Sequence, residues 1–453
     1  MRIRNKDTSS LVRVGQALKS VFSHPAGLFW AVVYALFIRM IIVYLSYRGI
    51  ATPTPDNGQF GAEMGWIARS IFLGWGFSSP YYPYTGPTAL MPPLFPYLLA
   101  GVFRCFGLYT ANSAFAILSI NALLSSLTCI SIYLCVEDFA GKRTARLASW
   151  LWVFYPFSIF FSATAVWDHT ITSFLFSVCF CVVQRLHRYD RLAAWLGFGV
   201  LYGISALSNP SILSMLPVLL FLAIHRMQAG LRRRFVLAVV AIVGICVSAG
   251  PWAARNYWVM RSFSPVRDGF WHEVWAGNTG DTSESNPSWP HPASNPVQME
   301  LFESQGEVNY LASNRTMALD RIHHHPVAFI EASLRRVIRF WTGFWSFRSS
   351  YLLLEPLDVP NVFFCSAITM LMFRGLQRLW RACSICGISY IFLIAIFPVP
   401  YYLTHSSMEY REPIEPEIVI LVTIGIFGFQ RGTISAGKQE ARELEVTERA
   451  IAV

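Results

Sequence analysis

The chain has 453 residues, of which 54% are hydrophobic and only 14% are charged. Soluble domains carry about 25% charged residues, so the composition excludes an ordinary water-soluble enzyme and indicates a membrane protein. The net charge of +10 comes from basic residues scattered over short loops, which argues against nucleic acid as a partner.

Apolar runs long enough to cross a bilayer recur along the chain. They predict an all-α polytopic membrane protein with about ten spans, at residues 24–47, 113–135, 146–164, 170–185, 193–208, 211–225, 234–254, 352–373, 383–402 and 415–430. We divide the chain into an N-terminal transmembrane module (1–254, including an outer loop at 48–112), a long outer loop (255–351), C-terminal transmembrane helices (352–430) and a cytoplasmic tail (431–453).

Lys and Arg predict the orientation, because basic loops stay in the cytoplasm. With ten spans, one side of the membrane holds 22 of the 36 basic residues and only 8 of the 26 acidic residues. That side is predicted to be cytoplasmic, together with both termini. We therefore expect a protein of the cytoplasmic (inner) membrane whose loops 48–112 and 255–351 face the periplasm.

Two outer segments have a distinctive composition. The stretch "LMPPLFPYLLAGVFRCFG", Leu90 to Gly107, predicts a helix lying along the outer membrane interface. It is short and begins with two prolines, and counting it as a span would move Lys142 and Arg143 outside. In the long loop, Gly277 to Pro296 is rich in Gly, Ser, Asn and Pro and predicts a flexible or substrate-gating segment.

Cysteine and histidine give little evidence for a cofactor. Eight of the nine cysteines lie in predicted spans, so no disulfide framework is expected. We interpret Cys383-x-x-Cys386 as a packing feature rather than a metal or redox site. The triplet His323–His325 has no accompanying ligand cluster and is interpreted as a solvated loop end. No cofactor and no metal ligand is predicted, and dependence on a divalent metal stays open.

The acids point to the outer interface. Apart from Arg39, the interiors of the predicted spans lack charged residues, whereas ion-coupled transporters usually need them near the membrane midplane. We expect the outer surface to hold a group of acids, namely Asp56, Glu63, Asp168, Glu409, Glu412, Glu415 and Glu417. Chemistry or binding is therefore predicted at that surface.

Several motifs in the outer loops resemble one family. Glu63 is followed by Trp66, by "IAR" and a glycine turn, and then by "PPLFP", which opens a helix that ends in "FG". Asp168 follows a span in the next outer loop, and "EYREPIEP", Glu409 to Pro416, precedes the last span. This order resembles the GT-C glycosyltransferases, in the branch of the dolichyl-phosphate-mannose protein mannosyltransferases and the bacterial lipid A aminoarabinose transferase.

The resemblance implies an inverting glycosyltransferase with a GT-C-like helix bundle. Its donor would be a sugar on a polyprenyl phosphate, and its acceptor an unidentified hydroxyl of a lipid, glycan or protein. Such a site needs a carboxylate to deprotonate the hydroxyl, a cation to hold the phosphate, and a groove for the lipid. The alternatives are a transporter or flippase for polyprenyl-linked sugars and a non-catalytic binding or scaffold protein.

Three acids are candidate catalytic residues under this interpretation. Glu63 is the candidate general base, and Asp56 is its rival in the same loop. Asp168 would position the sugar or the acceptor. The structural alternatives are that Glu63 is an exposed acid at a helix start and that Asp168 only caps the helix that begins at His169.

Four further residues are candidates for binding the substrate. Arg411 is the candidate phosphate clamp, with pairing to Glu409 or Glu412 as the alternative, and Arg69 is a second candidate. Tyr410 lies beside Arg411 in the same motif. His169 follows Asp168, and packing or solvation is the preferred explanation for its imidazole.

Overall fold

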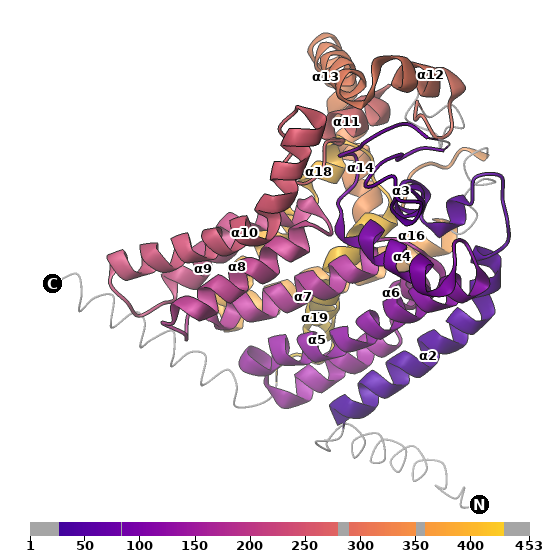
Figure 1. Ribbon diagram of the computed structural model, residues 1–453. Helices are drawn as coiled ribbons and strands as arrows, with labels where there is room; N and C mark the ends of the chain where they lie inside the picture. Colours follow the sequence, from indigo (N-terminus) through magenta and orange to yellow (C-terminus); the bar gives the residue numbers. More distant parts are fainter. Residues whose placement is uncertain (1–26, 83, 280–289, 350–357, 430–453) are drawn as a thin grey trace, which may run out of the picture.

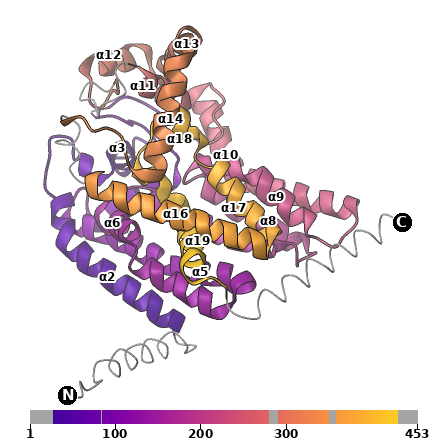
Figure 2. The same ribbon diagram turned by 180° about the vertical axis from the view of Figure 1, so that it is seen from behind.

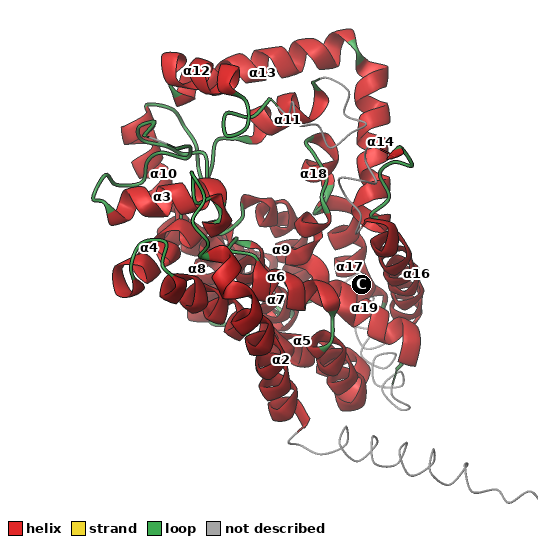
Figure 3. Ribbon diagram, turned by 90° about the vertical axis from the view of Figure 1, so that its right-hand side faces the viewer, coloured by secondary structure: helices red, strands yellow, loops and turns green. Residues whose placement is uncertain are grey.

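A computed structural model describes residues 27–82, 84–279, 290–349 and 358–429. Within these ranges the chain is helical, and the β-structure found there is one isolated bridge between Ser78 and Pro87. The all-α prediction is confirmed (Figure 3). The basic N-terminal and C-terminal tails lie outside the described residues.

The predicted spans fall on helices. Six of the described helical segments are long and apolar enough to cross a membrane, and they make this a multi-pass membrane protein: α2 (Gly27–Ile50), α5 (Ala111–Val153), α7 (His169–Leu186), α10 (Leu231–Met260), most of α16 (Asp358–Ala382), and α17 (Ser384–Ile396) with α18 (Val399–Leu403). The other predicted spans fall on shorter apolar helices: α6 (Pro156–Thr164), α8 (Leu192–Ala206), η2 (Pro210–Met215) with α9 (Leu216–His225), and α19 (Glu415–Phe427). Figures 1 and 2 show these helices as one slanted bundle with α19 inside it.

The chain reverses direction within α5. Gly141 has φ 80° and ψ 165°, which is not a helical conformation, and it divides α5 into two helices. The Trp152 indole donates to the carbonyl of Ser125, and the Ser149 hydroxyl donates to the carbonyl of Cys129. The second half of α5 therefore packs back on the first, as expected for two separate spans.

Arg39 is the charged residue predicted inside the first span. Its guanidinium is fully buried and donates to the hydroxyls of Ser125 and Ser158 and to the carbonyls of Trp152 and Val153. These carbonyls close the C-terminal end of α5, where a helix presents partial negative charge. Arg39 thus joins α2 to α5 and α6.

Glycines let two helix pairs cross closely. A Cβ added to Gly199 of α8 would lie 2.0 Å from the Ala241 carbonyl oxygen of α10, and one on Gly244 would lie 2.5 Å from that of Leu196. Gly375 of α16 meets the Leu421 carbonyl oxygen of α19 in the same way, at 1.8 Å. Small residues at such crossings are typical of membrane helices, because dispersion forces increase as the backbones approach.

The segments outside the bundle form what we call the cap layer. It consists of η1 (Gly58–Phe60), α3 (Ala62–Phe72), α11 (Phe270–Asn278), α12 (Pro296–Gln305) and α13 (Glu307–His324), at one end of the molecule in Figure 1. The short helix predicted from "PPLFP" is α4 (Leu94–Phe106), and α14 (Pro326–Thr342) leads from the cap layer back to α16. The last turn before α19 is η3 (Met408–Ile414).

Hydrogen bonds tie the cap layer to the first outer loop. The Glu307 carboxylate of α13 accepts from the Thr88 hydroxyl and from the Ala89 amide, the latter at 2.7 Å. Arg255 of α10 donates to the carbonyls of Thr88 (2.6 Å) and Phe77 (2.8 Å). The first loop is therefore held from two later parts of the chain.

The structure covers the proposed gating segment only in part. Gly277 and Asn278 end α11, and residues 280–289 lie outside the described residues. After this gap, His291 to Asn295 form a turn that leads into α12.

The close crossing of α8 and α10 generates the first prediction. Gly199→Ala should destabilise the protein by about 1–3 kcal/mol, because the added methyl group overlaps the α10 backbone. Gly197→Ala is the matched control in the same helix, since its Cβ would have no heavy atom within 4 Å. Thermal unfolding of the two variants in detergent measures the difference. Equal melting temperatures would contradict the crossing.

Candidate active site

Two outer turns meet at a glycine. Gly61 precedes α3 with φ 96°, and a Cβ there would lie 2.5 Å from the Val166 carbonyl oxygen in the turn between α6 and α7. Only a glycine fits this conformation and this contact. The structure thus brings together the two loops that carry Glu63 and Asp168.

Glu63 lies in the first turn of α3 and is buried, with 7% exposure. The alternative that it is an exposed helix-start acid is wrong. Burial raises the pKa of its carboxyl, and the nearby His291 and Arg267 oppose this shift. The Nε2 atom of His291 lies 3.5 Å from Oε1 of Glu63. Glu63 therefore faces a histidine from the middle of the long loop.

Asp168 precedes α7, as predicted, but its side chain makes no capping hydrogen bond. Capping alone therefore does not explain this residue. The carboxyl is buried, with 3% exposure, and burial raises its pKa to about 7, against the effect of Arg267. Its nearest ring nitrogen is Nδ1 of His169, at 3.6 Å.

Arg267 is a cation that the sequence did not single out. Its guanidinium favours the charged forms of both Glu63 and Asp168, so it lies within electrostatic reach of both. It also pairs with Glu273 of α11, with Nη2 3.2 Å from Oε1. This arginine is the positive charge that the two candidate acids share.

A second acid and a histidine extend the cluster toward η3. Oε2 of Glu273 lies 3.4 Å from Nδ1 of His405, and the Nε2 atom of His405 is hydrogen-bonded to the Tyr410 hydroxyl. Although burial alone would raise the pKa of Glu273, His405 and Arg267 lower it to about 2. Glu273 is therefore a permanent carboxylate. Tyr410 also stacks on Tyr401, with 4.8 Å between ring centroids.

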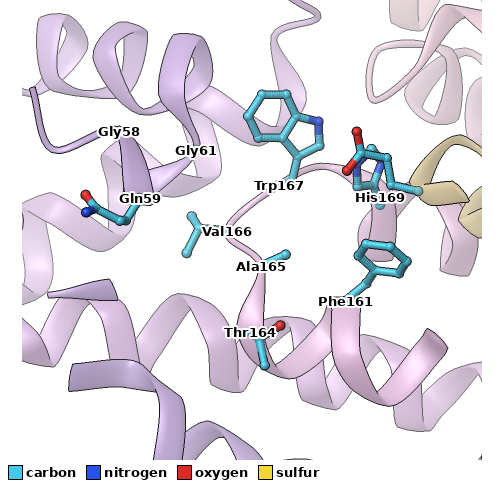
Figure 4. Close-up of a pocket in the computed structure, with 10 residues that line it drawn as sticks. Gly58, Gln59, Gly61, Phe161, Thr164, Ala165, Val166, Trp167 and His169 are labelled. Atoms are coloured by element: carbon cyan, nitrogen blue, oxygen red, sulfur yellow. The ribbon is translucent and has the colours of Figure 1, made fainter. Parts of the chain in front are cut away.

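A pocket of about 210 Å³ lies beside this cluster. Figure 4 shows Gly58, Gln59 and Gly61 on one side and Phe161, the turn from Thr164 to Trp167 and His169 on the other. Glu409 of η3 completes the lining. Neither Glu63 nor Asp168 lines the pocket, so His169 and Glu409 are the polar groups at which it adjoins the acids.

Asp56 and Arg69 have local partners. Asp56 is exposed, and its carboxylate accepts from the Gly58 amide and the Thr54 hydroxyl, which closes its own turn. Arg69 lies over the rings of Trp75 and Tyr82, at 5.2 and 5.4 Å from their centroids.

Arg411 has an internal partner. Its guanidinium is 1% exposed, pairs with Glu415 and lies over the Phe157 ring. The alternative partners considered above, Glu409 and Glu412, are not the ones it contacts in this ion pair. The Tyr155 hydroxyl donates to the other oxygen of Glu415.

The expectation that the acids lie at the outer surface is wrong for most of them. Asp56 is exposed, whereas Glu63, Asp168, Glu412, Glu415 and Glu417 are buried. Both carboxylate oxygens of Glu412 lack a hydrogen-bond partner, and burial raises its pKa well above its usual value. The sequence does not reveal this burial, because the acids lie at the ends of helices, next to charge-poor spans, and their side chains are buried there.

No group of three or more His, Cys, Asp or Glu residues suited to a metal ion occurs within the described ranges. Cys383 caps α17 by accepting from the Cys386 amide. His323 and His324 lie in the last turn of α13 and are exposed.

Sequence reasoning missed Arg267, Glu273, His291 and His405. Three of them lie in the long loop, which carries no family motif. The run "FWHEVW", Phe270 to Trp275, was the available signal, because it places an acid and a histidine among aromatic residues. His405 stands just before the "EYREPIEP" motif.

Comparisons with solved structures give the fold. The chain resembles the apo oligosaccharyltransferase of Archaeoglobus fulgidus, with a TM-score of 0.54, 14% identity, and coverage of 95% of this chain and 53% of the other. The same enzyme, AglB, in complex with an inhibitory peptide and a dolichol-phosphate matches with a TM-score of 0.53 and 15% identity. The match covers 95% of this chain and 53% of that chain. ArnT from Cupriavidus metallidurans bound to undecaprenyl phosphate matches with a TM-score of 0.39 and 13% identity. The match covers 89% of this chain and 78% of that chain. The chain thus spans about half the length of the oligosaccharyltransferase, with which it shares a fold.

The sequence comparisons locate the family signal. No curated protein matches the chain significantly. Residues 91–252, which run from α4 to α10, match the family described as dolichyl-phosphate-mannose-protein mannosyltransferase. The resemblance seen in the outer-loop motifs is therefore confirmed: residues 91–252 are similar to this mannosyltransferase family, and the fold is similar to that of the oligosaccharyltransferase.

Proposed function

We propose that this protein is an inverting glycosyltransferase that moves a sugar from a polyprenyl-phosphate donor to an acceptor hydroxyl. The observation that carries the proposal is that two buried carboxylates, Glu63 and Asp168, come from two loops that meet at Gly61 beside a pocket. The family match and the fold support it, and the related AglB structure contains a dolichol-phosphate.

Glu63 is the general base in this proposal. A raised pKa makes a carboxylate a stronger proton acceptor, which suits a weakly acidic hydroxyl. His291 and Arg267 also favour its charged form, which is the form that accepts a proton. Asp56 is the weaker candidate, since its carboxylate is exposed and occupied in its own turn.

Asp168 and His169 position the substrate. Asp168 holds the sugar or acceptor from the turn opposite Glu63, while His169 and Tyr410 contact the sugar. His169 lines the pocket, which supports its role. The centroids of the His169 and Tyr410 rings are 6.3 Å apart. Because the Asp168 carboxylate makes no capping hydrogen bond, its oxygens can accept hydrogen bonds from substrate hydroxyl groups.

The donor phosphate requires a cation, and Arg267 is our choice. Its side chain is 26% exposed, pairs with Glu273 and favours the charged forms of Glu63 and Asp168. Arg411 and Arg69 are the alternative ligands of the lipid phosphate or headgroup, and phosphate binding by Arg411 would require its buried pair with Glu415 to open. Such a buried pair is costly to break, because it leaves an isolated charge.

We place the site on the periplasmic side of the cytoplasmic membrane, with both termini in the cytoplasm. The basic residues support this orientation, because 22 of the 36 fall in the segments that the sequence predicts to be cytoplasmic. The same proposal includes about ten spans and boundaries of the chain's parts at residues 254, 351 and 430. It also includes a lipid, glycan or protein as the acceptor.

Replacing Glu63 tests the reaction. In transfer of labelled sugar from a polyprenyl-phosphate donor, Glu63→Gln should lower turnover by about 100- to 10,000-fold and leave donor binding intact, because the amide cannot accept the proton. Glu303→Gln, at an exposed position of α12, is the matched control. A flippase or scaffold would form no product even as wild type. Full turnover in Glu63→Gln with loss in Asp56→Asn would make Asp56 the base.

Asp168→Asn should lower activity without lowering stability. The folded pKa of Asp168, about 7, lies above its ordinary value of 3.8, so its contribution to stability is lost as pH rises through about 7. Removing the charge should therefore raise the melting temperature at pH 8 relative to wild type, and raise it less at pH 5. A melting temperature that falls at pH 8, or full activity, would contradict this.

Two arginine variants separate the candidate phosphate ligands. Arg411→Ala should lose about 3–5 kcal/mol of stability, because Glu415 is left as a buried unpaired charge, and adding Glu415→Gln should restore part of it. We expect this double variant to bind the donor normally. Arg267→Lys should bind it more weakly, since an ammonium replaces a bidentate fork. The reverse pattern of donor affinities would identify Arg411 as the clamp.

A further inference from the structure

His291 has a fixed place in the cap layer. Its carbonyl accepts from the amides of Ser294 (3.0 Å) and Asn295 (2.9 Å), and Asn295 in turn caps α12. The backbone of His291 is therefore part of the turn that starts α12. The Tyr310 hydroxyl of α13 donates to Gln298 at 3.0 Å, which ties α12 to α13. The histidine is thus anchored by two helices.

The imidazole of His291 is held between two rings. The edge of Tyr81, from the first outer loop, lies 5.3 Å from it between centroids, and His272 of α11 lies 5.4 Å from it. Its side chain is only 16% exposed. These contacts come from both sides of the site and leave the ring little freedom to turn away from Glu63.

A backbone amide selects the tautomer of His291. The Ala293 N–H donates to Nδ1 at 3.3 Å, so Nδ1 carries the lone pair. In the neutral imidazole the ring hydrogen must then sit on Nε2. Nε2 is the atom that lies 3.5 Å from Oε1 of Glu63. In the neutral ring, the N–H of His291 therefore sits on the nitrogen that approaches the candidate base.

We propose that His291 is a positioning residue for Glu63, which holds the carboxylate through Nε2–H and sets the pH range over which Glu63 accepts a proton. The inference rests on the proposed role of Glu63. Two other charged groups act on Glu63: Arg267 favours its charged form and Glu273 disfavours it. The charge of Glu63 in turn helps to raise the pKa of the Tyr81 phenol.

The direction of the effect follows from this arrangement. His291 opposes the burial that raises the pKa of Glu63. Removing the imidazole should therefore raise that pKa further and protonate the base at a higher pH. Since only the deprotonated base accepts a proton, the acidic limb of the pH–activity profile should move to higher pH. Activity should fall more at pH 6 than at pH 8.

The test uses two His291 variants of the full chain and one control. His291→Phe keeps an aromatic ring between Tyr81 and His272 but removes the N–H, and His291→Gln restores a donor. His323→Ala, at an exposed histidine of α13, is the control. We expect the acidic limb to move to higher pH in His291→Phe, less in His291→Gln, and not at all in His323→Ala. The KM for the polyprenyl-phosphate donor should change little.

Infrared titration of Glu63 gives a readout that does not depend on activity. The protonated-carboxyl band that Glu63→Gln abolishes reports the Glu63 pKa, which should be higher in His291→Phe than in wild type. An unchanged band and an unchanged pH profile would overturn the role of His291 while leaving the transferase intact. Full activity in Glu63→Gln would instead overturn Glu63 as the base, and this inference with it.

Discussion

The candidate site depends on the burial of two carboxylates at one place. Glu63 and Asp168 come from different loops, and burial raises the pKa of both, so neither would readily stay charged in isolation. Arg267 offsets part of this cost for each. The arrangement requires the two loops to meet, and the contact of Gly61 with the Val166 carbonyl fixes that meeting at backbone level. The surrounding helices have the task of holding these short loops in register.

The cap layer supplies what the bundle lacks. The bundle is apolar and carries Asp168 at the start of one of its helices, whereas Arg267, Glu273 and His291 come from the long loop. Only His405 and Tyr410 approach from the C-terminal side. The site is therefore assembled from three distant parts of the chain. A transferase that must admit a lipid donor and a hydrophilic acceptor gains from such a division, because each part faces a different solvent.

The sequence predicted the helices better than it predicted their neighbours. Hydrophobicity located the spans, and the prolines before α4 identified a short helix, because these signals are local. The reversal at Gly141 also agreed with the separation of two spans. By contrast, the partner of Arg411 was not predictable: Glu415 is four residues away, but so many acids flank this arginine that spacing cannot select one. The contact of His291 with Glu63 joins residues more than 200 positions apart. The hydrophobic periodicity of strands or helices cannot predict such a contact. Burial of Glu412 and Glu417 was likewise hidden, because an acid at the start of an apolar helix looks the same whether it faces water or protein.

The hydrogen bond between Glu307 and Thr88 has a consequence for biosynthesis. The two residues are 219 positions apart, and the first loop cannot be closed until α13 has been made. At about 5–20 residues per second, roughly 10–45 seconds separate the synthesis of the two partners. During that interval the N-terminal helices are already entering the membrane, while Thr88, Ala89 and Glu63 still lack the groups that cover them. A chain whose synthesis has not reached α13 thus lacks the Glu307 contacts that hold the first loop.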